Sequence, residues 1–516
     1  MKQLEITIKT LFGLEEALKE EICELGYKNI KLLNRAVQVD GTWEDVYRFN
    51  YRCRLAIAVL VKIDEFKIHK EEDLYKKAKK IDWTSYFDVD RTFAVKGSVF
   101  STVFRHTQYP LLLVKDAIAD VFRDKYNNRP DVNVKSPQVV IDVHITDKTV
   151  VLSLNTNGLP LYQRGYRQEI GEAPINEVLA AGLLRLSGWD RKSTLIDPMT
   201  GSGTIAIEAA LWAANIPAMI ERTHYAFKNF KSYDEDIWQK VQAEGNRRPQ
   251  NLGFPILAYD IDGEMIQKAK RNSKIAPIGN MIKFEIGDAT KITAPKQKGI
   301  VICNPPYDER LHENAEQLYE DLGNNFKHNF VGFDCWIISS NMEALKRVGL
   351  HPSKKLNVFN GNLECSFRQF QIFKGSKKEH IIEELGDDYV EQKPIEQKAP
   401  IKNKEDEKKA EKEKGKYEIK GNEQPTVLKP KNKDLKLIDK KSYTRDYKDS
   451  KSKYSFGQSV EDENLKPKTE DLKPNVSEKK YDSKQPKDEI KRPKTRKNQQ
   501  ESLKDKLNKI KRKRGS

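Results

Sequence analysis

The chain has 516 residues, of which 37% are hydrophobic and 33% charged, and its formal net charge is +16 at pH 7. This length allows two or three domains, and no apolar run in the sequence approaches the ~18 residues that a membrane-spanning helix needs. The five cysteines are scattered without a C-x-x-C pair and the first residues do not open a signal peptide, so we expect free thiols, a cytoplasmic protein and no membrane partner.

Most of the positive charge lies in the last part of the chain. Residues 376–516 hold 41 basic and 29 acidic residues, a net +12, with few large apolar ones. Such a segment cannot bury enough apolar surface to offset its ordering entropy, so we predict that it is disordered. Its basic end, Lys509 to Arg514, suits nucleic acid, and a purely solubilising tail is the alternative.

Residues 1–54 have the pattern of a small α+β module. Strands at 4–8 and 30–39 alternate with helices at 14–25 and 43–53, and a strong strand at 55–63 follows. This order fits a ferredoxin-like domain.

Residues 55–165 have the pattern of a second α+β unit. After the strand at 55–63 come a helix at 73–80, a strand at 91–100, a helix at 111–126 and a hairpin at 139–154.

A polar and basic segment of this unit, with Arg105, His106 and Lys115, surrounds a helix start. At 103–108 and 115–118 the sequence resembles the THUMP domain of RNA-modification enzymes. The resemblance implies an RNA-binding platform that includes these three residues. A structural hydrogen-bonding role for His106 stays open beside it.

Between the two halves of the chain, tyrosines and arginines alternate in the segment 161–167. Arg164, Tyr166 and Arg167 suit contacts with the phosphates and bases of RNA. A linker strand with a structural role is an equally open interpretation.

Residues 166–375 alternate short apolar strands with helices, which predicts a parallel sheet flanked by helices. The segment closes with a hairpin, because Asn360-Gly361 separates two strand-like runs. The predicted elements are helices at 175–186, 205–214, 264–276, 317–330 and 342–348, and strands at 194–197, 256–260, 282–286, 299–303, 335–339, 355–359 and 364–373.

A glycine-rich turn with Thr200, Gly201, Gly203 and Thr204 follows the strand at 194–197. Glycines let the backbone approach a ligand closely, and the amino terminus of the next helix can face a carboxylate or phosphate. Dinucleotide sites also use such turns. Here, however, the acid that ends the next strand, Asp260, lies some 60 residues on rather than the ~20 of the dinucleotide pattern.

Four successive strands end in a polar side chain: Asp197, Asp260, Asp288 and Asn304. Because ligands bind at the carboxyl edge of an open α/β sheet, we expect the four to share one site. Asp197 can accept from an ammonium group, Asp260 from two ribose hydroxyls, and Asp288 from an adenine amino group. The histidines are scattered, so we expect no metal.

Asn304-Pro305-Pro306-Tyr307 ends the strand at 299–303. The Asn304 side-chain carbonyl and the Pro305 backbone carbonyl can accept the two N–H bonds of a base amine and favour a pyramidal, nucleophilic nitrogen. The prolines fix these acceptors, and Tyr307 offers a ring for a flipped-out base. A strand followed by a plain proline turn is the simpler alternative.

Several motifs between Tyr162 and Phe373 together carry a specific resemblance: YQRGYR, DPMTGSGTIAIEAA, YDID, GDA, NPPYDER and NGNLECSFRQF. The chain resembles the bacterial THUMP-containing guanine-N2 methyltransferases of 23S ribosomal RNA. The resemblance implies a Rossmann-like class I methyltransferase fold, S-adenosylmethionine held by the acidic strand ends and the glycine turn, and a base amine positioned by Asn304 to Tyr307.

Two departures from this family stand in the motifs, since many relatives have Cys at the position of Thr200 and Gly at the position of Asp308. The second methyltransferase domain that some relatives carry is absent, so the resemblance implies one modified guanine in RNA. Two alternatives remain: an amino-group methyltransferase acting on adenine or protein glutamine, and a non-catalytic RNA-binding ribosome assembly factor. The sequence does not determine the oligomeric state.

Overall fold

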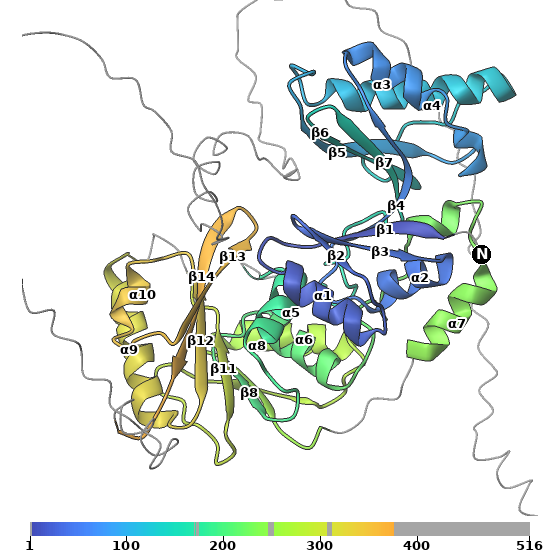
Figure 1. Ribbon diagram of the computed structural model, residues 1–516. Helices are drawn as coiled ribbons and strands as arrows, with labels where there is room; N and C mark the ends of the chain where they lie inside the picture. Colours follow the sequence, from blue (N-terminus) through green and yellow to red (C-terminus); the bar gives the residue numbers. More distant parts are fainter. Residues whose placement is uncertain (1–2, 170, 172–174, 246–251, 307–311, 376–516) are drawn as a thin grey trace, which may run out of the picture. The chain divides into compact units, whose positions relative to one another are not determined.

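The computed structural model describes residues 3–169, 171, 175–245, 252–306 and 312–375, all within one compact unit. They form two seven-stranded sheets with helices packed against them, which confirms the predicted α/β class (Figure 1). The tail predicted to be disordered, 376–516, and Tyr307 lie outside the described residues.

The first sheet joins the two amino-terminal units through one strand, β4. Residues 58–61 of β4 pair with β1, and residues 60–67 pair with β7. Strands β5 and β6 run parallel, and the other neighbouring pairs run antiparallel. In the order β2-β3-β1-β4-β7-β6-β5, the strands are β1 (Leu4–Lys9), β2 (Lys31–Leu33), β3 (Ala36–Gly41), β4 (Ala58–Lys67), β5 (Phe93–Phe100), β6 (Val139–Thr146) and β7 (Thr149–Asn155).

One predicted strand of this sheet, at 30–39, is two strands of a hairpin, β2 and β3. Arg35 has a backbone φ of 57°, in the left-handed region, and this reverses the chain. The sequence lacks a glycine there, so the turn gave no signal.

Helices cover this sheet and share one apolar core with it. Helices α1 and α2 pack on the ferredoxin-like strands, and α3 and α4 pack on the THUMP part (Figure 1). Helix α4 begins with Pro110 in its first turn and ends at Asn127 in the left-handed conformation, both common at helix ends. The helices are α1 (Glu15–Glu24), α2 (Trp43–Arg52), α3 (Glu71–Ala78), α4 (Tyr109–Tyr126) and the short η1 (Trp83–Ser85).

The second sheet has the order β10-β9-β8-β11-β12-β14-β13. Its first five strands run parallel, and β14 runs antiparallel to both β12 and β13. The strands are β8 (Thr194–Asp197), β9 (Ile256–Asp260), β10 (Ile282–Ile286), β11 (Gly299–Cys303), β12 (Asp334–Ser339), β13 (Lys354–Asn360) and β14 (Leu363–Gln371). The predicted parallel sheet with a terminal hairpin is confirmed.

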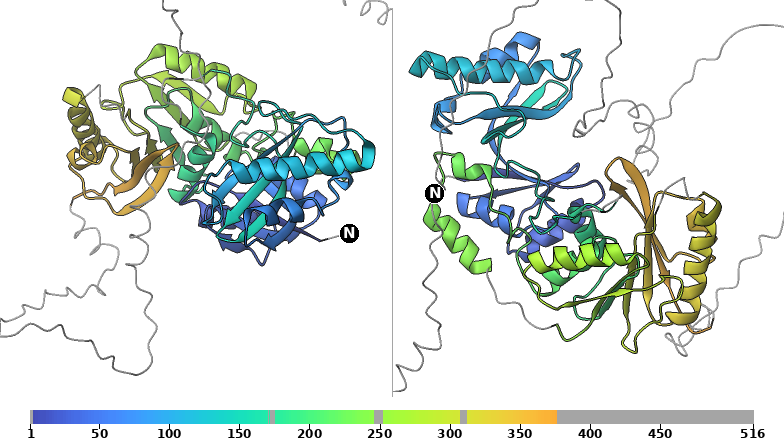
Figure 2. Two further views of the ribbon diagram at one scale, coloured as in Figure 1. Left: turned by 90° about the horizontal axis from the view of Figure 1, so that it is seen from above. Right: turned by 180° about the vertical axis from the view of Figure 1, so that it is seen from behind.

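Helices cover both faces of this sheet (Figure 2). One apolar cluster joins one face to α5 and α6, and a second cluster joins the other face to α9 and α10. This double winding leaves the carboxyl edge of the sheet as the place where loops meet. The helices are α5 (Glu177–Leu186), α6 (Thr204–Ala213), η2 (Ala226–Asn229), α7 (Glu235–Gly245), α8 (Gly263–Ile275), α9 (His312–Asn329) and α10 (Ala344–Arg347).

The aromatic segment between α6 and β9 packs against the amino-terminal half of the chain. Trp238 of α7 contacts Tyr47 and Tyr51 of α2 edge-on, with ring centroids 6.1 and 5.5 Å apart, and it also contacts Phe227. These rings are buried in the core of the first sheet. They are therefore core residues rather than residues of a site.

The segment 161–167, in which tyrosines and arginines alternate, lies where the two halves of the chain meet. We call this segment the strip and this contact region the junction. Arg164 forms an ion pair with Glu208 of α6 at 3.2 Å, and both side chains are fully buried. The Tyr166 hydroxyl donates to the same carboxylate at 3.0 Å, and Arg164 donates to the backbone carbonyls of Arg54 and Leu161. We call Arg54, Arg164, Tyr166 and Glu208 the junction cluster.

This location corrects the interpretation of the strip as an RNA-contact surface for Arg164 and Tyr166, because both side chains are buried and their polar groups bond within the chain. Arg167 is nearly buried as well, since it pairs with Glu177 at 3.0 Å and donates to the carbonyl of Ile175. Burial raises the pKa of Glu177 to about 7, and the Arg167 guanidinium opposes that rise. The alternative of a structural linker describes all three residues.

Candidate active site

The carboxyl ends of β8, β9, β10 and β11 lie at one edge of the second sheet. Asp197 pairs in register with Ala258 of β9, and Asp260 pairs with Ile286 of β10. Strand β8 is flanked by β9 on one side and β11 on the other, so the order of strands reverses beside it. Open α/β sheets bind ligands at such a switch point. The four predicted residues thus stand at the ends of four neighbouring strands, and their sharing of one ligand stays a prediction.

The glycine turn after β8 is held by its neighbours. Gly201 and Gly203 have φ values of 54° and 89°, which side chains rarely adopt. The Gly201 amide donates to Asp260 Oδ2 at 2.8 Å, and the Thr200 amide donates to the carbonyl of Tyr259 at 2.8 Å. A Cβ on Gly203 would lie 3.0 Å from the Cβ of Ala269, so the turn also packs closely on α8.

Helix α6 begins at Thr204, directly after this turn, and Thr204 is buried. The first amides of a helix have no partner within the helix and carry partial positive charge. The turn therefore presents a suitable surface to an anionic group.

Asp197 is the most unusual group at this edge. It is fully buried, its Oδ2 accepts from the Thr200 hydroxyl at 2.7 Å, and its Oδ1 has no hydrogen-bond partner among the described residues. Burial raises the pKa of Asp197 to about 7, and the nearby Asp260 adds to the rise. A buried acid without a cation partner is costly, so the site is suited to a positively charged ligand group.

Asp260 and Asp288 differ from Asp197 in their partners. Asp260 accepts from the amides of Gly201 and Asp262, so it ties the glycine turn to the start of α8. Asp288 accepts from the amide and hydroxyl of Thr290. The Lys291 ammonium and the Thr290 hydroxyl lower the pKa of Asp288 to about 2. Both carboxylates keep acceptor capacity beyond these bonds, because each has about four lone-pair positions.

Two exposed isoleucines next to these acids were missed by the sequence reasoning. Ile261, directly after Asp260, is 71% exposed, and Ile286, two residues before Asp288, is 68% exposed. The signal that could have found Ile261 is an apolar residue directly after a strand-terminal acid. Together they offer an apolar surface beside polar acceptors, which suits a flat heterocycle.

Asn304 follows the last residue of β11 directly and is half-buried, whereas Pro305 is buried and Pro306 is exposed. Cys303 before it is fully buried, and burial raises the pKa of this thiol well above its usual value. Tyr307 lies outside the described residues, so its predicted stacking role is not addressed by the structure.

The predicted THUMP residues lie before α4 and in its second turn. Arg105 and His106 are exposed in the loop before the helix, and Lys115 on the helix pairs with Asp116 at 2.7 Å. Their surface is open to a partner, unlike that of the strip residues.

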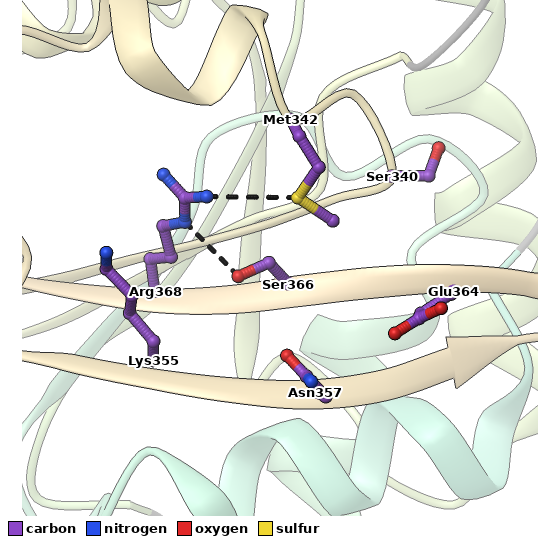
Figure 3. Close-up of a pocket in the computed structure, with 7 residues that line it drawn as sticks. All are labelled: Ser340, Met342, Lys355, Asn357, Glu364, Ser366 and Arg368. Atoms are coloured by element: carbon purple, nitrogen blue, oxygen red, sulfur yellow. Dashed lines mark hydrogen bonds between the residues drawn. The ribbon is translucent and has the colours of Figure 1, made fainter. Parts of the chain in front are cut away.

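A hollow of about 520 Å³ is lined by residues of β13 and β14 and by residues that follow β12 (Figure 3). Register pairs Cys303 of β11 with Ile337 of β12, so Asn304 and Ser340 both lie just beyond adjacent strand ends. The lining residues are Ser340, Met342, Lys355, Asn357, Glu364, Ser366 and Arg368.

Within the described residues, no three His, Cys, Asp or Glu side chains converge as a metal site. No helix in this described part is long and apolar enough to cross a membrane.

Comparison with known proteins places this geometry in a family. A family model for the RMKL-like methyltransferase domain matches residues 164–369, a THUMP domain model matches 69–155, and a model of the RlmL ferredoxin-like domain matches 5–60. A possible methylase from Clostridium difficile 630, known as a crystal structure, is 31% identical and has a TM-score of 0.66. The match covers 73% of this chain and all of that one. The chain belongs to the THUMP-domain methyltransferases.

Two further relatives illustrate this THUMP-domain methyltransferase family. A ribosomal RNA large subunit methyltransferase K/L from Psychromonas ingrahamii is 36% identical over 71% of this chain and 50% of its own length. The chain thus spans about half the length of that curated relative. A protein described as a predicted N6-adenine-specific DNA methylase from Listeria monocytogenes is 27% identical, with a TM-score of 0.65, over 72% of this chain and 97% of that one.

In this THUMP-domain methyltransferase, the matched methyltransferase segment extends from Arg164 of the junction cluster to β14. It contains the four polar strand ends, the glycine turn and the hairpin that lines the hollow.

Proposed function

We propose that this protein transfers a methyl group from S-adenosylmethionine to the exocyclic N2 amine of a guanine in RNA, with 23S ribosomal RNA as the substrate. One observation carries the proposal. Strands β8 and β11 are neighbours at the switch point of the sheet, and β8 ends in Asp197, a buried acid without an ion-pair partner among the described residues, whereas β11 leads into the Asn-Pro-Pro segment that begins at Asn304. The first suits a cationic cofactor group, and the second suits a planar amine.

The residues at β8, β9 and β10 fit the methyl donor group by group. The unpartnered Asp197 oxygen would accept from its ammonium group, and the amides that open α6 would bind its carboxylate. Asp260 and Asp288 would accept from the ribose hydroxyls and the adenine amino group, and Ile261 and Ile286 would contact the ring. When bound, the cofactor supplies a methyl group on a sulfonium, which leaves as a neutral thioether.

Asn304 and Pro305 act on the other reactant, the base amine. Their carbonyls accept the two N–H bonds, which localises the nitrogen lone pair and aims it at the methyl group. The nitrogen would attack the methyl carbon with the neutral thioether as leaving group, and the methylated nitrogen would then lose its proton to water. No strong base is required, because the methylated ammonium is acidic.

RNA is favoured as substrate by the THUMP region and by the name of the Psychromonas ingrahamii relative. Guanine N2 follows from the resemblance of the motifs around Asn304. Adenine is the second candidate base, because Asn-Pro-Pro can hold any planar amine and the Listeria monocytogenes relative is described as acting on adenine.

Nucleoside mass spectrometry of fragment-mapped 23S RNA from a deletion strain tests the proposal. We expect one N2-methylguanosine to be lost, restored by the wild-type gene and not by Asn304→Ala. In purified protein, Asn304→Ala should lower kcat by roughly 10²–10³-fold with cofactor affinity kept.

Asn280→Ala is the matched control, because Asn280 is exposed and lies just before β10, at the opposite edge of the sheet. An unchanged guanosine profile with a lost methyladenosine would replace guanine by adenine. Near wild-type turnover by Asn304→Ala would remove Asn304 from the mechanism. Rescue of every defect of the deletion strain by that variant, if catalytically dead, would favour the assembly-factor alternative.

A further inference from the structure

The hollow at the carboxyl end of β12 is lined by one face of the β13–β14 hairpin. Alternate residues of the two strands face it, namely Lys355 and Asn357 from β13 and Glu364, Ser366 and Arg368 from β14 (Figure 3). The other face of the hairpin places Val358 and Phe367 in the apolar core. A polar face that lines a hollow at the edge of a catalytic sheet is suited to a ligand.

Two cations stand opposite each other on this face. Register pairs Lys355 directly with Arg368, and like charges in such positions destabilise a hairpin. Figure 3 shows both side chains on the same side of the ribbon. Among the described residues, neither side chain forms an ion pair; the Arg368 guanidinium donates to the Ser366 hydroxyl at 3.2 Å and contacts the Met342 sulfur at 3.8 Å.

Burial makes the uncompensated charge of Arg368 more costly. The Arg368 side chain is half-buried, and burial lowers its pKa below the usual value. Glu364 is the one carboxylate among the lining residues, and it lies four residues from Arg368, about 13 Å along an extended strand. The positive end of the hollow therefore lacks a counter-ion that an anionic ligand would supply.

Neutral donors complete the lining. Asn357 pairs in register with Ser366, and Ser340 faces them from the end of β12. Hydroxyl and amide groups beside a guanidinium form the donor set that phosphate oxygens accept from.

The hollow adjoins the amine side of the switch point, not the cofactor side. It borders β12, the neighbour of β11, whereas the predicted cofactor residues follow β8, β9 and β10. The hollow therefore lies on the same side of the switch point as Asn304.

We propose that this hairpin site binds a backbone phosphate of the substrate RNA beside the target nucleotide, through Arg368 and Lys355. The proposal rests on RNA being the substrate. The phosphate holds the strand while Asn304 holds the extruded base, so the two contacts fix one nucleotide from both ends.

The test compares Lys355→Ala and Arg368→Gln with Lys354→Ala. Lys354 is equally exposed, lies on the same strand, and points to the opposite face because side chains alternate along a strand. The probe is a fluorescein-labelled single-stranded RNA of about 12 nucleotides with one central guanine, and binding is followed by anisotropy at several salt concentrations. Cofactor affinity is measured in parallel.

We expect each site variant to weaken RNA binding roughly three- to tenfold at low salt and to reduce the slope of log affinity against log salt by about 0.7. KM for RNA should rise while kcat and cofactor affinity stay at wild-type values. Lys354→Ala should match wild type in all of these.

The outcomes separate this site from the proposed function. Site variants that match Lys354→Ala, with the wild type methylating RNA, would overturn the phosphate site and leave the function standing. If the site variants reduced the salt slope but the wild type transferred no methyl group, the phosphate site would stand and the proposed function would be overturned. A wild type that binds cofactor but no RNA would overturn both.

Discussion

Glu208, on helix α6, and Asp197, at the end of β8, are both fully buried carboxylates, and each has one oxygen without a hydrogen-bond partner among the described residues. They differ in that Glu208 has an ion-pair partner. Glu208 has a guanidinium from this chain, Arg164, at 3.2 Å and a hydroxyl from Tyr166. Asp197 accepts from the Thr200 hydroxyl, the backbone amides of Met199 and Ala206 also favour its ionised form, and it has no ion-pair partner among the described residues. A buried acid paired within the chain holds domains together, whereas a buried acid left without a cation marks a site for a cationic ligand.

Breaking the junction cluster should give the largest effect. Arg164→Ala leaves Glu208 as a buried charge with only hydrogen bonds to protein groups, so we expect a loss of roughly 3–5 kcal/mol in the free energy of unfolding. Denaturant unfolding followed by fluorescence measures it.

Arg347→Ala is the control for Arg164→Ala. Arg347 forms an exposed ion pair with Glu316 and should contribute at most about 1 kcal/mol. An Arg164→Ala loss no larger than this control would mean that the junction cluster does not hold the two halves together.

Asp197→Asn tests the buried acid that has no ion-pair partner among the described residues. It removes an uncompensated charge, so stability should stay at or above wild type, while affinity for S-adenosylmethionine falls roughly 10–100-fold. Calorimetric titration gives the affinity, and Asp236→Asn, on the exposed surface of α7, is the control. If Asp197→Asn and Arg164→Ala lost the same amount of stability, the buried acid at Asp197 would not differ from the paired acid at Glu208.

The pH dependence of S-adenosylmethionine binding tests whether Asp197 binds the ligand's ammonium group. The pKa of Asp197 is about 7 in the free protein, and a bound ammonium favours the ionised form, so the bound pKa is lower. Below about pH 7 binding must release a proton. Wild-type affinity should therefore fall as the pH drops through 7 and level off above it, and Asp197→Asn should lose this dependence. A wild-type affinity that stays constant across this range would contradict the assignment.

Ile261→Ala should give the smallest effect. The side chain is 71% exposed in the free protein, so stability should be unchanged, and the lost apolar contact should weaken cofactor binding roughly three- to fivefold. Ile275→Ala, at the last residue of α8, is the matched control in the same calorimetric assay. Unchanged cofactor affinity in Ile261→Ala would exclude a contact with the cofactor ring.

The sequence by itself determined the sheet of the methyltransferase half and the location of its site. Short apolar runs such as 299–303 become buried parallel strands, and the polar residue that stops each run falls at the carboxyl edge. These are short-range signals, in which each strand carries its own boundary. The Asn-Gly signal indicated the hairpin in the same local way, although Asn360 ends β13 and the two turn residues are Gly361 and Asn362.

Tertiary structure alone decided which charged residues face a ligand. Arg164 has the same local signal as an RNA-contacting arginine, but its partner, Glu208, is 44 residues away in the chain. The opposition of Lys355 and Arg368, and the missing partner of the Asp197 oxygen, likewise exist only once strands and helices are assembled. Periodicity reports local conformation, whereas burial and charge compensation depend on contacts between residues distant in sequence, and these contacts separate the junction from the site.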